Sequence, residues 1–313
     1  MSRRSSLKQQ ASSPDSGIRR ICAICVICGC LLSFSCFKLD SFLFDPATVD
    51  EYLQMSSADS AAWHVRGIIP DSLVELVTLT GLDSNRVYGF FVRQPGGVDI
   101  PATDEYTVIY NHGNGQNINR YWGRVELLWE AGCNVFIYDY EGYGKSEGSP
   151  SGKACYADAD AALDSVLARP DVVGSMVVYY AWSLGSFMAC HLAADNGSFK
   201  PRCLILENPM ASTSALAQEG AVLGIPGSFV ADADFDNESR MRFLGCRTLI
   251  IYGKQDQTAV PARHALVLFD KAYGWIPVTA WPVGGADHAD LPEVMGYGEY
   301  ERVVSAFIAG DSL

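Results

Sequence analysis

The 313-residue sequence predicts an α/β fold in which a mostly parallel central sheet is flanked by helices. Several short runs of the chain are wholly apolar, which is typical of strands that are covered on both faces. These runs alternate with longer stretches of helical spacing. Polar, glycine-rich clusters follow the apolar runs, and ligands bind outside the carboxyl ends of the strands in such a sheet. Together the three observations predict both the architecture and the edge that carries the site.

The sheet is predicted to begin with a hairpin. Residues 73–80 and 86–92 alternate like strands, and the residues from Gly81 to Asn85 between them have turn composition. The parallel strands are then expected at residues 106–110, 134–138, 176–180, 203–206, 248–252 and 278–281. Helices are expected at residues 121–131, 154–168, 187–194, 262–272 and 297–308. The length allows one large domain or two small ones.

The N-terminal part differs in composition from the rest. Residues 1–20 form a basic polar segment, and residues 21–37 contain no charged side chain. A basic flank before an apolar run is typical of a secretory signal or an N-terminal membrane anchor. The length is short for a spanning helix and long for a signal core, which leaves both open. The linker at 38–65 and the domain at 66–311 are then expected on the non-cytoplasmic side of a membrane, exported or anchored.

The charge of the chain argues against nucleic acid as a partner. The first 38 residues hold six of the 23 basic and one of the 36 acidic residues, so the remainder carries 17 basic and 35 acidic side chains. A body this acidic without a local basic patch is not expected to bind nucleic acid. A small-molecule or acyl substrate is expected, with membrane contact through the N-terminal apolar segment.

The cysteines divide evenly between the two parts of the chain. Five of the ten lie in the N-terminal segment, where Cys30 follows a sequence that faintly resembles a bacterial lipoprotein cleavage box, so lipidation is one alternative. The other five lie in or beside apolar segments, as small buried hydrophobes do: Cys133, Cys155, Cys190, Cys203 and Cys246. No C-x-x-C pair with histidine partners occurs in the body, and neither a metal nor another cofactor is expected.

One segment predicts a nucleophile. Ser183 stands between the apolar run at 176–180 and a helical stretch, in the sequence Ala181-Trp182-Ser183-Leu184-Gly185. Small residues on either side allow a strand to turn sharply into a helix, which exposes the serine. The helix N-terminus then directs backbone N–H groups at an anion that forms beside it. A serine that caps an ordinary helix is the alternative for this motif alone.

Four further clusters follow predicted strands: Asn111 to Gly115, Asp139 to Gly148, Gly253 to Pro261 and Gly284 to His288. With these motifs in this order, the chain resembles the α/β-hydrolase superfamily over roughly residues 73–307. It looks closest to the serine-aminopeptidase-like group and to small eukaryotic α/β-hydrolase-domain proteins. Those proteins carry N-H-G-N, D-x-R-G-x-G-x-S and G-x-x-D-x-x-V-P loops. This chain departs from the second loop, because Glu141 replaces the usual arginine and reverses a charge near the site.

The resemblance implies an α/β-hydrolase fold and a serine hydrolase that cleaves a carboxylic ester or thioester through an acyl-enzyme. Ser183 is the expected nucleophile, and His288 is the expected base because it alone of five histidines follows the last strand in a glycine-rich loop. Asp256 is expected to orient His288. Asp287 and Asp139 are the rival acids.

The oxyanion donors are expected to be the backbone N–H groups of Leu184 and Asn114. His112, Gly113 and Gly115 are expected to bind substrate or to shape the loop around Asn114. The glycines of the loop at 139–148 lack the spacing of a phosphate-binding loop and are expected to shape it.

Residues 208–245 separate two predicted strands by more than one helix requires. Because this segment contains several apolar side chains, it is a candidate lid suited to an acyl chain or another hydrophobic group. A helix and loop that complete the core are the alternative. A cluster of four acidic residues in it, Asp232, Asp234, Asp236 and Glu238, lacks the glycine of a calcium loop, so a solvated acidic turn is expected instead of a metal site.

Two other functions stay open at the level of sequence. A peptidase or aminopeptidase-like amide hydrolase would use the same three side chains. A non-catalytic α/β-hydrolase-fold binding protein would need none of them.

Overall fold

The computed structural model describes residues 43–52, 65–95, 106–197, 199–220 and 235–313. The chain divides into two compact units, Met1–Lys38 and Leu39–Leu313, and the described residues belong to the second. The segments at 1–20 and 21–37, with the predicted signal or anchor, therefore lie outside the described residues. Within the described part, no helix has the length and apolar character needed to cross a membrane.

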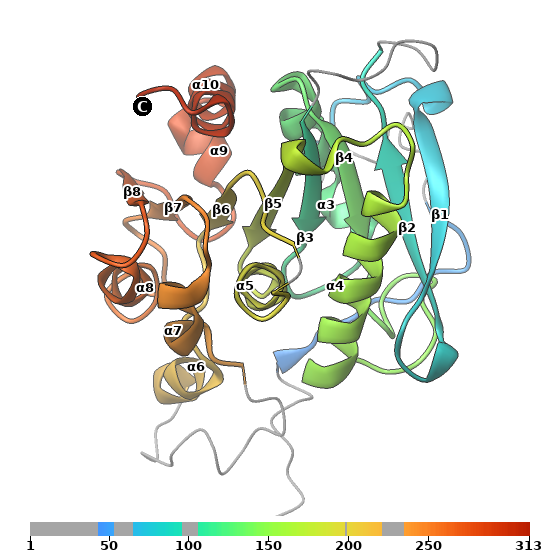
Figure 1. Cartoon of the computed structure of the whole chain (residues 1–313). Helices are drawn as coiled ribbons and strands as arrows, with labels where there is room; N and C mark the ends of the chain where they lie inside the picture. Colours follow the sequence, from blue (N-terminus) through green and yellow to red (C-terminus); the bar gives the residue numbers. More distant parts are fainter. Residues whose placement is uncertain (1–42, 53–64, 96–105, 198, 221–234) are drawn as a thin grey trace, which may run out of the picture. The chain divides into compact units, whose positions relative to one another are not determined.

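In the described part of the chain, eight strands form one sheet in the order β1-β2-β4-β3-β5-β6-β7-β8 (Figure 1). The strands are β1 (Val74–Thr80), β2 (Arg86–Val92), β3 (Thr107–Asn111), β4 (Asn134–Tyr138), β5 (Val177–Trp182), β6 (Leu204–Glu207), β7 (Thr248–Gly253) and β8 (Val278–Val283). β2 pairs antiparallel with β1 and β4, and every other pair is parallel. The predicted hairpin and parallel sheet are confirmed.

Helices cover both faces of the sheet (Figure 1). They are α3 (Ile118–Glu130), α4 (Gly152–Leu167), α5 (Gly185–Ala194), α6 (Thr213–Gly220), α7 (Asn237–Arg240), α8 (Ala265–Ala272), α9 (Leu291–Met295) and α10 (Tyr297–Ala309). Short 3₁₀ turns occur at η2 (Asp71–Leu73), η3 (Leu82–Ser84), η4 (Gly174–Met176) and η6 (Met241–Phe243). The α5 and α8 side chains pack in one core layer, and the α3 and α10 side chains pack in the other.

β5 shows why wholly apolar runs predicted the buried strands. Its side chains alternate between the two core layers: Val177, Tyr179 and Ala181 face one, and Val178, Tyr180 and Trp182 face the other. All six residues are buried, so neither face of the strand tolerates the polar residues of a half-exposed strand. Ser183 follows directly, at the carboxyl end of this central strand.

The candidate lid at 208–245 is described at both ends. Ser212 forms an antiparallel bridge with Asp236, and Phe235 stacks on Phe187 of α5 with ring centroids 4.4 Å apart. Asn237 donates to the carbonyl oxygen of Met210 at 2.8 Å. The two ends are therefore joined at their base and packed on α5, while residues 221–234, with most of the apolar side chains that predicted a lid, lie outside the described residues.

The sequence predicts a linker at 38–65, and residues 43–52 of it pair with two loops of the sheet edge. Pro46 bridges to Gln116, and Thr48 bridges to Gly144. The Tyr52 hydroxyl donates to Asp139 Oδ2 at 2.7 Å. This stretch is held by backbone and side-chain hydrogen bonds because it runs along polar loops whose amides need partners.

Candidate active site

Ser183 occupies a strained turn between β5 and α5. Its φ of +56° lies in the left-handed region, which residues other than glycine rarely adopt. The turn needs a glycine at position 185, because a Cβ there would collide with the carbonyl oxygen of Asn111 on β3. The backbone N–H of Ser183 donates to the Glu207 carbonyl at 3.0 Å, which fixes the turn to β6. The predicted sharp turn of strand into helix is therefore present.

The structure brings the three predicted side chains together. Ser183 Oγ lies 2.8 Å from His288 Nε2, and His288 Nδ1 lies 2.7 Å from Asp256 Oδ2. The three come from loops after β5, β7 and β8. Ser183 is 3% exposed, Asp256 is 1% exposed, and the His288 side chain is 15% exposed, so the histidine is the member nearest to solvent.

Backbone hydrogen bonds hold the Asp256 carboxylate in place beside the histidine. Its Oδ1 accepts from the backbone N–H groups of Thr258 and Ala259, each at 2.8 Å, and Oδ2 is left for His288. With Nδ1–H donated to this carboxylate, Nε2 is the lone-pair nitrogen that accepts from the Ser183 hydroxyl. The arrangement can remove the serine proton and stabilise the imidazolium that results.

The two rival acids have other partners. Asp287 Oδ1 accepts from the backbone N–H groups of His288 at 2.8 Å and Gln257 at 3.2 Å, so it holds the loop and not the ring. Asp139 Oδ1 accepts from the Ile118 N–H at the start of α3 at 3.0 Å. Neither carboxylate takes the position that Asp256 holds.

The predicted oxyanion donors belong to the residue after Ser183 and to the β3–α3 loop. Leu184 is fully buried at the start of α5, and the β3–α3 loop approaches so closely that a Cβ on Gly113 would lie 3.4 Å from Ser183 Cβ. Asn114 follows in that loop, and its side-chain Oδ1 accepts from Asp45 N at 2.7 Å, Gly115 N at 2.8 Å and Tyr143 OH at 2.9 Å. Three donors on one oxygen fix the peptide that carries the predicted Asn114 N–H.

His112 is fully buried behind this loop. Its Nδ1 lies 2.8 Å from the Gly113 carbonyl, and its ring stacks on Tyr121 with centroids 4.6 Å apart. Its Nε2 lies 3.2 Å from Asp139 Oδ1 but without hydrogen-bond geometry. Gly115 has a φ of +90°, which a side chain would strain. These positions favour the loop-shaping role for His112 and Gly115 over direct contact with a substrate.

The loop at 139–148 winds around two buried carboxylates. A Cβ on Gly144 would collide with Asp139, and a Cβ on Gly148 would collide with Glu141, so both glycines make room for acids. Glu141 Oε2 accepts from Asn85 Nδ2 at 2.9 Å, and the Glu141 backbone N–H donates to Asp158 Oδ2 at 2.8 Å. Burial raises the pKa of Asp158 to about 8, although the hydrogen bond from the Glu141 N–H opposes this, and the Glu141 carboxylate adds a smaller increase.

One histidine outside the site, His264, has structural surroundings. His264, expected inside a helix, instead precedes α8 as its N-cap residue with non-helical backbone angles. Its buried Nδ1 accepts from the Ala211 N–H at 3.0 Å, which ties α8 to the segment after β6.

The five body cysteines are buried and free, as predicted for small hydrophobes. Among the described residues, no group of three or more side chains is placed to hold a metal ion.

Sequence reasoning missed the residues that support the His288 loop. Trp182 Nε1 donates to the His288 carbonyl at 3.1 Å, and Asn208 Nδ2 donates to the same oxygen at 2.8 Å. Arg124 Nη2 donates to the Ala289 carbonyl at 3.0 Å. Trp182 adjoins the nucleophile and Asn208 directly follows β6, so their positions were a signal, whereas Arg124 lies inside a helix and gave none.

With this geometry in place, known proteins identify the family. The model of the family described as Serine aminopeptidase, S33, matches residues 103–305. The chain belongs to this family of α/β-hydrolases. It is 31% identical over 256 residues to alpha/beta hydrolase domain-containing protein 17B of Xenopus laevis, covering 80% of this chain and 81% of that protein. It is also 31% identical over 201 residues to the uncharacterized protein YfhR of Escherichia coli K12, covering 63% and 68%.

Solved structures agree on the fold. The Pyrococcus furiosus esterase Pf2001 superposes with a TM-score of 0.65 at 16% identity, covering 86% of this chain and 98% of the esterase. A puromycin-hydrolyzing peptidase of Mycobacterium tuberculosis superposes with a TM-score of 0.57 at 14% identity, covering 76% of this chain and 40% of the peptidase. At these identities the likeness establishes the α/β-hydrolase fold, and the family membership implies a hydrolase of small-molecule substrates.

Proposed function

We propose that this protein is a serine hydrolase that cleaves a carboxylic ester or thioester through an acyl-enzyme. The observation that carries the proposal is the unbroken chain of contacts from Ser183 Oγ to His288 Nε2, at 2.8 Å, and from His288 Nδ1 to Asp256 Oδ2, at 2.7 Å. A serine hydroxyl is a weak nucleophile until a base removes its proton, and this geometry supplies that base.

The reaction follows from these contacts. Ser183 Oγ attacks the substrate carbonyl while His288 Nε2 takes its proton, and Asp256 stabilises the imidazolium. The backbone N–H groups of Leu184 and Asn114 receive the oxyanion. His288 then protonates the leaving alcohol or thiol as the carbonyl–leaving-group bond breaks. Water, deprotonated by His288, attacks the acyl-Ser183 ester, releases the acid and restores the hydroxyl.

An ester or thioester is favoured over an amide for two reasons. Among the solved structures that share the fold are esterases, including Pf2001 and RhEst1 of Rhodococcus. The candidate lid at 208–245 is rich in apolar residues, which suits an acyl chain. The family description and the puromycin-hydrolyzing peptidase favour amide cleavage as the second candidate.

We also propose that residues 21–37 place the domain on the non-cytoplasmic side of a membrane, either as a retained anchor or as a cleaved signal. The support is the uncharged apolar run behind a basic flank. Fractionation of cells that express the full chain and a chain lacking residues 1–38 tests this. Equal recovery of both chains in the cytosolic fraction contradicts it.

The nucleophile is tested with a fluorophosphonate probe and a substrate panel. Wild-type protein is expected to be labelled and to hydrolyse p-nitrophenyl esters, and Ser183→Ala is expected to lose both activities. Ser186→Ala is the matched control, because Ser186 is a buried serine on the same turn and its Oγ bonds to Met210. Folded wild-type protein that neither labels nor turns over any ester or aminoacyl anilide favours the non-catalytic binding protein. Turnover of anilides alone favours the peptidase.

A further inference from the structure

A buried ion pair lies behind the histidine of the candidate site. Arg124 on α3 donates to Glu207 Oε1 through Nε at 3.0 Å and through Nη2 at 2.7 Å. Glu207 is fully buried at the carboxyl end of β6. Its second oxygen accepts from the hydroxyls of Tyr180 and Tyr300, the latter at 2.8 Å. Both oxygens of the Glu207 carboxylate therefore accept hydrogen bonds. The donors lie on α3, β5 and α10, which together fix its position.

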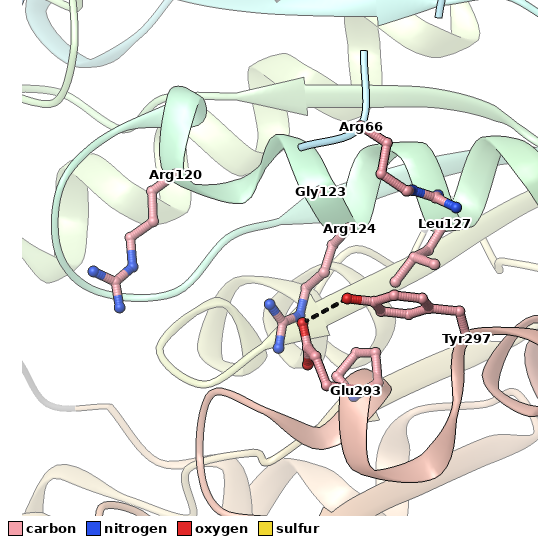
Figure 2. Close-up of a pocket in the computed structure, with 8 residues that line it drawn as sticks. Arg66, Arg120, Gly123, Arg124, Leu127, Glu293 and Tyr297 are labelled. Carbon is pink, nitrogen blue, oxygen red and sulfur yellow. Dashed lines mark hydrogen bonds between the residues drawn. The ribbon is translucent and has the colours of Figure 1, made fainter. Parts of the chain in front are cut away.

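Arg124 connects this pair to the loop that carries His288. Its Nη2 also donates to the carbonyl oxygen of Ala289 at 3.0 Å, one residue after the histidine. Figure 2 shows the Arg124 side chain reaching from α3 toward the turn with Glu293. The guanidinium thus holds the backbone beside His288 with a group that cannot rotate away without breaking its bonds to Glu207.

Trp182 completes the connection through its ring. The Arg124 guanidinium lies 4.0 Å from the Trp182 ring centroid, and the His288 ring lies 5.7 Å from that centroid at an angle of 34°. The Trp182 indole N–H donates to the His288 carbonyl. The imidazole therefore contacts an indole that is itself held by a partly buried cation, and that cation also bonds to the next residue of the loop.

We propose that Arg124, fixed by Glu207, is a positioning residue that holds His288 within reach of Ser183. This inference rests on the proposed function, because it assigns the histidine as the base. A base displaced by about 1 Å costs on the order of 100-fold in rate. Arg124 acts through Trp182 and the Ala289 carbonyl and touches no reacting atom.

The pair also sets the charge beside the histidine. Charged groups on the elements around His288 include Asp256 and Lys254 after β7, Asp287 and Asp290 in its own loop, Arg120 and Arg124 on α3, Glu207, and Glu293 on α9. Arg124 and Glu207 carry opposite charges and are paired with one another. Removing one charge leaves the other uncompensated in a poorly solvated region.

The first test is Arg124→Lys, which keeps the charge but removes the planar fork. We expect kcat for a p-nitrophenyl ester to fall about 10- to 100-fold, with KM changed less than about twofold. Arg169→Lys is the matched control. The Arg169 guanidinium also donates hydrogen bonds to two carboxylates, those of Glu75 and Asp171. It lies 3.8 Å from the centroid of the Phe91 ring. Lysine at 169 is expected to leave kcat unchanged.

The second test is the pH profile of kcat/KM in two variants. Glu207→Gln leaves Arg124 unpaired, which disfavours the imidazolium, so the apparent pKa of the base is expected to fall. Arg124→Gln leaves Glu207 unpaired, so the apparent pKa is expected to rise, each by about 0.3 to 1 unit. A structural role alone would not produce shifts of opposite sign.

Each outcome decides the proposal. Equal kcat in Arg124→Lys and wild type, or equal losses in Arg124→Lys and Arg169→Lys, overturns it. Shifts of the same sign in the two charge variants overturn the electrostatic part. Should Glu207→Gln or Arg124→Gln fail to fold, the lysine pair alone still decides whether Arg124 positions His288. If the wild-type protein shows neither labelling nor turnover, the proposed function itself fails. That result differs from an active wild type with an unaffected variant, which overturns only the role of Arg124.

Discussion

His288 and His191 each contact a carboxylate through Nδ1, yet only His288 is placed to act as a base. His288 contacts Asp256 through Nδ1 at 2.7 Å and the Ser183 hydroxyl through Nε2 at 2.8 Å. His191, on α5, contacts Asp195 through Nδ1 at 3.1 Å and Asp160 through Nε2 at 3.2 Å. The difference is the partner of the second ring nitrogen, which is a hydroxyl at one site and a carboxylate at the other.

That difference changes the charge each ring favours. Burial lowers the pKa of His191, but hydrogen bonds from its ring to Asp160 and Asp195 more than offset this and hold the pKa above its ordinary value. An imidazolium donates from both nitrogens and has no lone pair for a proton. His288 has one carboxylate only, so a neutral ring with an accepting Nε2 fits its surroundings. Both positions hold a histidine, and the partner of Nε2 decides whether the ring can accept a proton.

The largest expected effect comes from removing the carboxylate that distinguishes His288. Asp256→Asn keeps the shape but favours the wrong tautomer of the ring, so kcat is expected to fall about 10⁴-fold with the fold intact. The same change at the other histidine, Asp195→Asn, is the control and is expected to leave kcat within about twofold. Steady-state kinetics with one ester substrate measures both. A loss of less than about 10-fold in Asp256→Asn contradicts the assigned role of this carboxylate.

The carboxyl of Asp158 gives a second comparison with Asp256. Asp158 is as buried as Asp256 but accepts fewer hydrogen bonds. Asp256 accepts from two backbone N–H groups and a histidine, whereas Asp158 accepts from the Glu141 N–H and lies near the Glu141 carboxylate. Burial raises the pKa of Asp158 to about 8, and the single hydrogen bond from the Glu141 N–H does not offset it. Its protonated form therefore contributes stability that is full below the pKa of the unfolded chain and is lost as pH rises through about 8.

Asp158→Asn removes that loss, since an amide does not ionise. We expect the variant to match wild type near pH 4 and to gain on it as the pH rises toward 8, by up to about 1.4 kcal/mol for each pH unit. Urea unfolding at several pH values measures the difference. Asp164→Asn is the control, because Asp164 lies exposed on the same helix. A stability difference that is constant with pH would mean that Asp158 ionises normally in the folded protein.

Much of the site was predictable because strand ends are local features. The apolar run before Ser183, the glycine-rich loop at His288 and the loop at Asp256 each follow a recognisable strand, and parallel strands bring their carboxyl ends to one edge. Arg124 and Glu207 were not predictable, since they lie 83 residues apart and meet only in the folded chain. Residues 43–52 look like a linker because their backbone partners belong to distant loops, which no local pattern records.

The smallest expected effect tests the other histidine. Because the pKa of His191 is raised in the folded protein, its charged form contributes stability that is full below the unfolded pKa and is lost as pH rises through the folded pKa. His191→Gln is therefore expected to cost about 0.5 to 1 kcal/mol at pH 5.5, since both acidic partners are nearly half exposed and screened, and less at pH 9. Esterase activity is expected to be unchanged, because a ring that donates from both nitrogens removes no proton. Urea unfolding at the two pH values, with kcat measured in parallel, checks both parts. A fall in kcat without a fall in stability would give His191 a role in the reaction and end the contrast with His288.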